Sequence, residues 1–158
     1  SRSTPGRRPD SGAQDVIVGD GETREKLERL VRRLGVQDFV MLCGALENPL
    51  PIVSGAAALI LASEYEGFSN AVLEAMFCDV PVITSYCSSD AREMCEQGAA
   101  LGFEVGDADG LVEEMVRVVR EEAVGRQIVQ RARIYRAPHD LKQAIPCYEE
   151  AIRGVLSP

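Results

Sequence analysis

The chain has 158 residues, 46% of them hydrophobic, and a net charge of −8, which predicts one globular domain with a sizeable core. The absence of a basic stripe beyond the first few residues argues against a nucleic-acid binder, because such proteins need clustered lysine and arginine. No hydrophobic run reaches the roughly 18 residues of a transmembrane helix and nothing resembles a signal peptide, so we expect a cytoplasmic protein.

Residues 1–14 are polar and rich in Pro, Gly and Ser, which predicts a disordered or loosely attached arm. From residue 15 to residue 158, short β-branched runs alternate with segments of helical periodicity, and we expect one domain there. The expected strands lie near Val16–Gly19, Val40–Leu42, Ala58–Leu61, Pro81–Thr84 and Leu101–Glu104. The expected helices, the second of them a short helix or turn, span 22–35, 48–56, 70–77, 90–97, 107–123, 125–136 and 140–156.

The expected strands are continuous hydrophobic runs rather than alternating ones, and a helix follows each of them. This pattern favours a parallel sheet that is covered by helices on both faces. The predicted fold class is therefore α/β, with a Rossmann-like doubly wound sheet.

The stretch SEYEGFSNAVLEAMF, residues 63–77, places two glutamates around a turn at the carboxyl end of a buried strand, where ligands bind in such sheets. The helix after the turn offers free N–H groups that favour a phosphate. Glu66 and Glu74, as carboxylates, only accept hydrogen bonds and suit hydroxyl groups. The combination fits a phosphate ester with several hydroxyls, such as a nucleotide-sugar. Two glutamates at this spacing also arise by chance, and Glu74 fits an ordinary exposed helix position.

The wider stretch EGFSNAVLEAMFCDVPVITS resembles the nucleotide-sugar-binding, C-terminal domain of GT-B glycosyltransferases, in particular glycosyltransferase family 4 (glycosyl transferases group 1). That family carries a Glu-x7-Glu motif, then Ala-Met and, a few residues later, Pro-Val. The runs DVIVGDGETREKLERL, FVMLCGALENPLPIVSGAAALILAS and GFEVGDADGLVEEMV are similar to its other strands and helices. The resemblance covers about residues 15–119.

The resemblance implies a role for each matching residue. Glu66, assigned to catalysis, would contact hydroxyls of the donor sugar, and Glu74 would hold the ribose. Gly44 and Leu46 would border the base. Backbone amides for the sugar and the diphosphate are assigned to four consecutive residues, Gly67, Phe68, Ser69 and Asn70. Enzymes of this kind transfer the sugar with retention and need no cofactor or bound metal, so the substrate is expected to be a UDP- or GDP-sugar.

The sequence also departs from the family. There, a first strand and helix precede the segment DVIVG and carry an Arg and a Lys for the diphosphate, and residues 1–14 are too short and polar to supply them. In the strand order 3-2-1-4-5-6, this first strand of the family lies at the centre of the sheet. We expect the remaining strands to form one parallel sheet in which the first and third runs either pair directly or leave a gap that another segment fills. Asp79 stands where the family usually has glycine, and Glu93 matches the family's glutamate.

Two classes of function follow. One is the donor half of a retaining glycosyltransferase that acts on a glycan or lipid-linked acceptor through a missing N-terminal domain, with the fragment alone inactive. The other is a non-catalytic module that binds a nucleotide or a protein. The five cysteines are odd in number and lack the spacing of a metal site, which favours a reducing compartment. Peripheral association with the cytosolic face of a membrane is compatible with both classes.

Overall fold

A computed structural model of the chain describes residues 14–67 and 69–139. The contacts divide the chain into two compact units, residues 1–49 and 50–158, which are taken one at a time below. The predicted arm lies outside the described residues apart from Gln14, and so do Phe68, Cys147 and the predicted helix 140–156.

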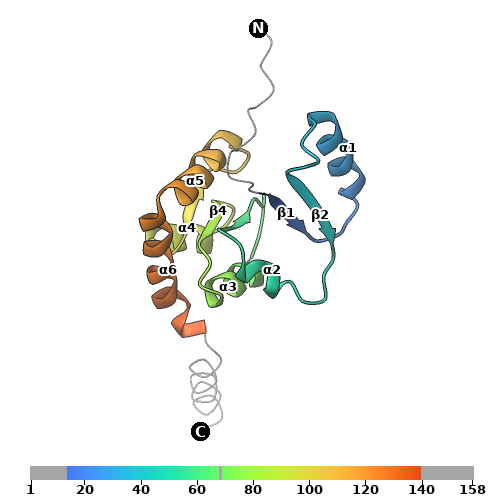
Figure 1. The fold of residues 1–158 in the computed structure, drawn as a ribbon. Helices are drawn as coiled ribbons and strands as arrows, with labels where there is room; N and C mark the ends of the chain where they lie inside the picture. The colour runs from blue at the N-terminus through green and yellow to red at the C-terminus, as the bar shows by residue number, and fades with distance from the viewer. Residues whose placement is uncertain (1–13, 68, 140–158) are drawn as a thin grey trace. The chain divides into compact units, whose positions relative to one another are not determined.

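The first unit contains strand β1 (Asp15–Val18), helix α1 (Arg24–Leu34) and strand β2 (Val40–Gly44), and the two strands pair in parallel (Figure 1). Helix α1 ends at Gly35, whose φ of 69° lies in the left-handed region that glycine adopts readily. The hydrophobic face predicted for this helix is incompletely covered, because Leu30 and Leu34 are 37% and 61% exposed. No residue of α1 is buried.

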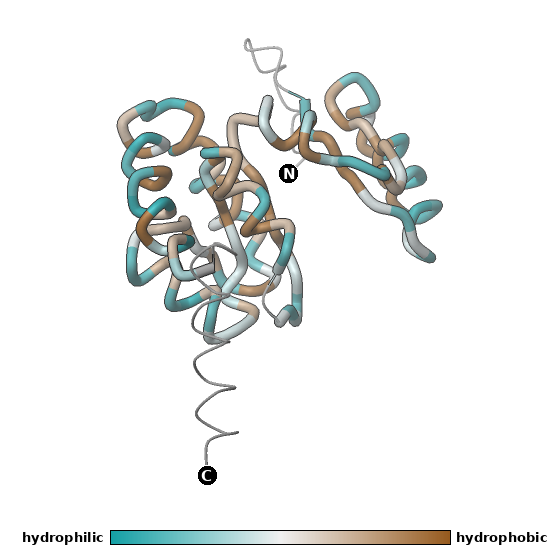
Figure 2. Tube along the Cα trace, turned by 90° about the horizontal axis from the view of Figure 1, so that it is seen from below, coloured by the Kyte–Doolittle hydropathy of each residue, from teal (hydrophilic) through white to brown (hydrophobic). Residues whose placement is uncertain are grey.

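The second unit continues the alternation of helices and strands that the sequence predicts. Its elements are α2 (Leu50–Ser54), β3 (Leu59–Leu61), α3 (Asn70–Phe77), β4 (Val82–Ser85), α4 (Ser89–Glu96), β5 (Leu101–Phe103), α5 (Ala108–Arg120), α6 (Glu122–Arg136) and the 3-10 turn η1 (Ala137–His139). Hydrophilic and hydrophobic positions alternate along the helical coils in Figure 2, as expected of helices with one buried face.

The strands are parallel, as predicted, but they do not form the expected single sheet. β1 pairs with β2, while β3, β4 and β5 form a separate three-stranded sheet in that order. Among the described residues, β1 and β3 do not pair, so the alternative of direct pairing is wrong. The reason is topological: removing the central strand from the order 3-2-1-4-5-6 leaves the pieces 3-2 and 4-5-6, whose ends are not neighbours.

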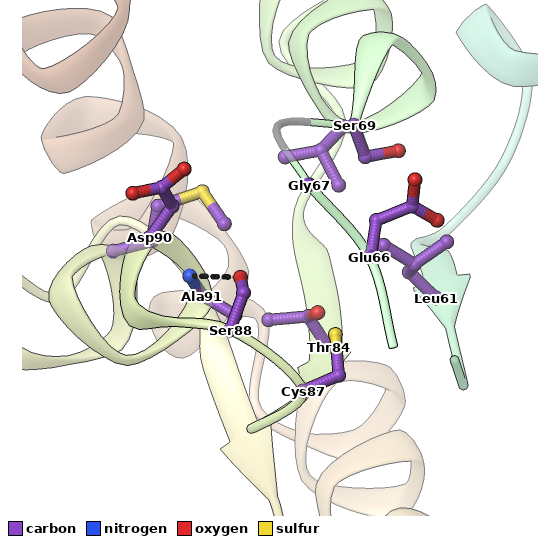
Figure 3. Close-up of a pocket in the computed structure, with 11 residues that line it drawn as sticks. Leu61, Glu66, Gly67, Ser69, Thr84, Cys87, Ser88, Asp90 and Ala91 are labelled. Carbon is purple, nitrogen blue, oxygen red and sulfur yellow. Dashed lines mark hydrogen bonds between the residues drawn. The ribbon is translucent and has the colours of Figure 1, made fainter. Parts of the chain in front are cut away.

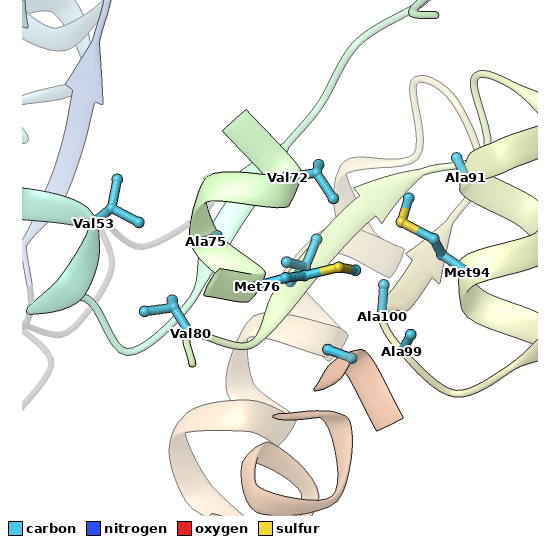
Figure 4. Packing of buried hydrophobic residues seen from close by; sticks show 11 residues of the cluster. Val53, Val72, Ala75, Met76, Val80, Ala91, Met94, Ala99 and Ala100 are labelled. Carbon is cyan, nitrogen blue, oxygen red and sulfur yellow. The ribbon is translucent and has the colours of Figure 1, made fainter. Parts of the chain in front are cut away.

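Strand β4 lies at the centre of the second unit, and all four of its residues are buried. Val82 packs in a cluster with Val72, Ala75 and Met76 of α3 and with residues of α4, seen in Figure 4. Ile83, the next residue, belongs to a second cluster formed with residues of β5, α5 and α6. Successive strand residues point to opposite faces, so this sheet is covered on both sides, as its hydrophobic runs predict.

The long helix predicted over 107–123 is shorter in the structure. Helix α5 ends at Arg120, and α6 begins at Glu122 rather than at residue 125. Between them Glu121 has φ −111° and ψ 80°, outside the helical region. The break redirects the chain, and α6 buries Ile128 and Ala132. The sequence therefore predicts the two helices but places the boundary between them too late.

The cysteines of the described residues are free thiols at positions 43, 78, 87 and 95. Burial raises the pKa of the Cys95 thiol to about 12, so this cysteine is a poor nucleophile at neutral pH. Within the described part of the chain, no helix is long and apolar enough to cross a membrane.

Asp79 follows helix α3 with a φ of 58°, in the left-handed region that glycine adopts most readily. Aspartate tolerates the left-handed region better than most residues. Its carboxylate also accepts two hydrogen bonds from Arg133 of α6, at 2.9 Å and 2.7 Å. Arg136 lies 3.4 Å from the same carboxylate, donates to the carbonyl of Met76 and stacks over the ring of Phe77. The aspartate thus joins the end of α3 to α6.

We expect Asp79→Asn to lower the melting temperature by a few degrees at pH 7 and by less at pH 3. The hydrogen bonds from Arg133 hold the pKa of the Asp79 carboxyl below its usual range. Because the pKa is lower in the folded state, the carboxylate stabilises the fold at pH values above its unfolded-state pKa of about 3.9. This stabilisation is lost as the pH falls through the folded-state pKa. The pair is largely solvated, so the effect is small. Thermal unfolding of both proteins across this pH range is the measurement, and an equal difference at both pH values would contradict the assignment.

Candidate functional site

A pocket lies at the carboxyl ends of β3 and β4, the edge where ligands bind in open parallel sheets. Leu61, the last residue of β3, and Thr84, near the end of β4, form its floor. The loop from β3 to α3 forms one wall, and the loop from β4 to α4 forms the other (Figure 3). The pocket has an empty volume of about 270 Å³, part of which is open solvent.

The β3–α3 wall is held in place by a buried serine. Ser85, which is 1% exposed, donates its hydroxyl to the backbone carbonyl of Ser63 at 2.6 Å. The Ser63 hydroxyl in turn approaches Oε2 of Glu66 at 3.4 Å. β4 therefore fixes the path of the loop that carries Glu66, and the carboxylate has a polar neighbour on the loop side.

The two helices that begin at the pocket differ in whether the N-cap side chain accepts a hydrogen bond from an N–H group of the first turn. At α4, the side chain of Ser88 accepts a hydrogen bond from the N–H of Ala91 at 3.2 Å. At α3, Ser69 occupies the corresponding N-cap position, but its side chain makes no capping hydrogen bond among the described residues. The first N–H groups of a helix have no partner within that helix. The start of α3 is therefore the better place for an anionic group.

The β4–α4 wall rests on an aromatic side chain. The ring of Tyr86 lies against the backbone of Gly102 in β5, where a Cβ would come within 2.3 Å of the ring. The guanidinium of Arg92 lies over the ring of Tyr86, 4.8 Å from the ring centroid. The same guanidinium lies 3.7 Å from the carboxylate of Glu104. Burial raises the pKa of the Tyr86 hydroxyl. This packing anchors the residues that follow Tyr86 along the pocket.

Three of the residues predicted for the site line this pocket: Glu66, Gly67 and Ser69. Asn70 is the first residue of α3. Glu74 lies one turn further along α3, half-buried, and is not among the lining residues.

The remaining assignments stay predictions. Gly44, which ends β2 with a φ of 73°, and Leu46 belong to the first unit. Phe68 lies outside the described residues. The assignment of Glu74 to a ribose also stays a prediction.

The structure adds pocket residues that the sequence reasoning missed: Thr84, Cys87, Ser88 and Asp90. Thr84 belongs to β4, Cys87 and Ser88 to the β4–α4 loop, and Asp90 to the first turn of α4. The stretch CSSD contains neither glycine nor a motif. A signal was nevertheless available. The rule that ligands bind at the carboxyl ends of parallel strands applies to β4 as much as to β3.

Among the described residues, the lining of the pocket carries two carboxylates and no lysine, arginine or histidine. Glu66 and Asp90 are both half-buried, and neither forms a salt bridge with another described residue. Across residues 14–67 and 69–139, no group of three or more His, Cys, Asp or Glu side chains could hold a metal ion. The pocket offers hydrogen-bond acceptors at its walls and amide donors at the start of α3, a combination suited to a neutral polyol attached to an anion.

Comparison with known proteins decides the family. The family described as glycosyl transferases group 1 matches residues 6–121, well over half of the chain. The chain belongs to the group 1 glycosyl transferases. This confirms the family and the α/β fold class predicted from the sequence.

Individual relatives agree with this membership. This glycosyl transferase chain is 35% identical over 113 residues to lipopolysaccharide 1,6-galactosyltransferase of Salmonella typhimurium, covering 67% of the chain and 31% of the relative. It is 29% identical to N-acetyl-alpha-D-glucosaminyl L-malate synthase of Bacillus anthracis, covering 77% of the chain and 32% of that protein.

Solved structures show the same fold. Anabaena HepE in complex with UDP superposes with a TM-score of 0.81 at 19% identity, over 90% of this chain and 41% of HepE. At that identity the likeness concerns the fold alone. A complex of HepE with UDP-glucose is also known. The chain spans about a third of the length of the two curated relatives.

Proposed function

We propose that the chain is the donor-binding part of a retaining glycosyltransferase that takes a sugar from a nucleoside-diphosphate sugar, a UDP- or GDP-sugar. The observation that carries the proposal is the pocket at the carboxyl ends of β3 and β4, which is lined by both Glu66 and Ser69, the N-cap residue of α3. Family membership and the UDP complexes of a protein with this fold support it.

In this proposal, the transfer breaks the bond between the anomeric carbon and the diphosphate, so negative charge develops on the leaving group. Amides at the start of α3 would stabilise that charge, which is how fixed donors assist such reactions. Glu66 would accept hydrogen bonds from sugar hydroxyls and orient the ring.

The acceptor would be a glycan or a lipid-linked sugar, bound through a further domain as in two-domain enzymes of this class. The proposal places the reaction in the cytoplasm or at the cytosolic face of a membrane, which the free thiols at positions 43, 78, 87 and 95 fit. Because the proposal places the acceptor site in a further domain, we expect no sugar transfer by these 158 residues alone.

Calorimetric titration with UDP, GDP and ADP tests the proposal. We expect one of the three to bind with a Kd on the order of 1 mM, a free energy of about −4 kcal/mol, because no arginine or lysine lines the pocket to neutralise the diphosphate. A single nucleotide preferred over the other two would support donor binding. No binding by any of them at about 10 mM would overturn the proposal and favour the alternative, a non-catalytic module that keeps only the fold.

A further inference from the structure

The buried side chain of Ser85 continues the contact between β4 and the β3 side of the sheet beyond the point where their backbones stop pairing. The pairing of β3 with β4 ends at Leu61 and Thr84. Ser85, the next residue, pairs through its backbone with Phe103 of β5, on the opposite side. Its hydroxyl reaches back across β3, where it donates to the carbonyl of Ser63 at 2.6 Å and lies 3.5 Å from the carbonyl of Leu61. A side chain thus takes over where the strand pairing ends.

The contact leads on from Ser63 to Glu66, three residues along the same loop. Both side chains are half-buried, and the Ser63 hydroxyl lies 3.4 Å from Oε2 of Glu66. This second hydrogen bond is long, so the position of the loop depends mainly on the short bond from Ser85. Ser85 does not line the pocket itself, whereas Glu66 does. Any influence of Ser85 on a ligand therefore passes through the loop.

We propose that Ser85 is a positioning residue: its hydroxyl fixes the β3–α3 loop so that the carboxylate of Glu66 is held where it accepts hydrogen bonds from the donor sugar. This rests on the proposed function, because it takes Glu66 to contact the sugar. A backbone carbonyl that loses its donor has to find another partner, usually water. Without the Ser85 hydroxyl, the Ser63 carbonyl turns toward solvent, and the loop that carries Glu66 moves with it.

A general loss of stability has to be separated from this effect, because Ser85 is buried. Ile128→Val in α6 is the matched control. Ile128 is 4% exposed, belongs to the cluster on the other face of the sheet from Val82, and does not line the pocket. Removing one methylene from a packed core destabilises a protein without disturbing a distant loop. Ser85→Ala and Ile128→Val should both lower the melting temperature, and only the first should affect the loop.

Amide hydrogen exchange in the ligand-free chain tests the contact directly. We expect residues 64–67 to exchange about fivefold faster in Ser85→Ala than in the wild type, because a lost hydrogen bond makes local opening easier by that order. Ile128→Val should leave the exchange of these residues unchanged. Ser85→Cys, which has a weak S–H donor in place of the hydroxyl, should lie between alanine and wild type, and it replaces Ser85→Ala should that variant not fold.

The consequence for the ligand is measured with UDP and UDP-glucose. Ser85→Ala should weaken binding of UDP-glucose by about three- to tenfold and leave the Kd of UDP within about twofold of wild type. In a Glu66→Gln background, Ser85→Ala should cause almost no further loss, because the two changes remove the same interaction. If GDP is the nucleotide that binds, GDP and GDP-mannose replace the UDP compounds.

The outcomes distinguish the inference from the proposed function. Unchanged exchange at residues 64–67 in Ser85→Ala, or an equal rise in Ile128→Val, overturns the role of Ser85 while nucleotide binding by the wild type still supports the proposed function. Fully additive losses from Ser85→Ala and Glu66→Gln show that Ser85 does not act through Glu66 and also overturn it. Absence of binding by every nucleotide overturns the proposed function and the inference with it, and faster exchange at residues 64–67 would then mark Ser85 as a structural residue.

Discussion

Glu74→Gln is expected to weaken binding of the preferred nucleoside diphosphate by about ten- to a hundredfold. The resemblance to the family assigns Glu74 to the ribose, which every such nucleotide contains. Replacing the carboxylate by an amide removes charge-assisted hydrogen bonds, which are typically worth about 1.5–3 kcal/mol. Glutamine and glutamate have similar helix propensities, so α3 should be unaffected. Calorimetric titration of both proteins with the same nucleotide is the measurement.

Glu66→Gln serves as the matched comparison, because Glu66 lines the pocket and Glu74 does not. It should leave the affinity for the bare nucleotide almost unchanged and weaken binding of the intact nucleotide-sugar only. Both variants should melt within a few degrees of wild type. An equal loss of nucleotide affinity in the two variants would show that the division of roles between sugar and ribose is wrong.

Gly102→Ala is expected to destabilise the second unit by about 1–3 kcal/mol, the usual cost of overfilling a packed site. The added Cβ would lie 2.3 Å from Cε1 and 2.4 Å from Cζ of Tyr86, well inside contact distance. The ring must therefore leave its place between Gly102 and Arg92. A change of this size should lower the melting temperature by several degrees. Because Tyr86 precedes the loop with Cys87 and Ser88, the pocket wall should shift as well.

A double-mutant cycle identifies the cause. In a Tyr86→Ala background the ring is gone, and Gly102→Ala should then be close to neutral. If alanine at position 102 costs the same with and without the ring, the backbone conformation is responsible and the contact with Tyr86 is not.

Much of this fold follows from local pattern in the sequence. The hydrophobic runs of β3 and β4 and the periodicity of α3 identify these elements nearly to the residue, because each signal lies within a few consecutive positions. The parallel pairing follows from strands alternating with helices. The pocket wall that carries Glu66 was also predictable, since it follows a buried strand directly.

The opposite wall was not predictable in the same way. It follows Tyr86, whose ring packs on Gly102 in the following strand, and this contact leaves no periodic trace in the sequence. The division into two sheets likewise depends on which strands are neighbours, and a list of strands does not contain that information.

The sequence by itself determined the family, the order of strands and helices, and the position of Glu66 beside the start of α3. Its signals are short-range, and they suffice wherever a residue's role depends on its own strand, turn or helix. The tertiary structure alone decided how distant segments meet. Asp79 pairs with Arg133, 54 positions away, and Ser85 holds Ser63, 22 positions away. Such contacts depend on the packing of whole elements around β4, because only that packing brings the two side chains within hydrogen-bond distance.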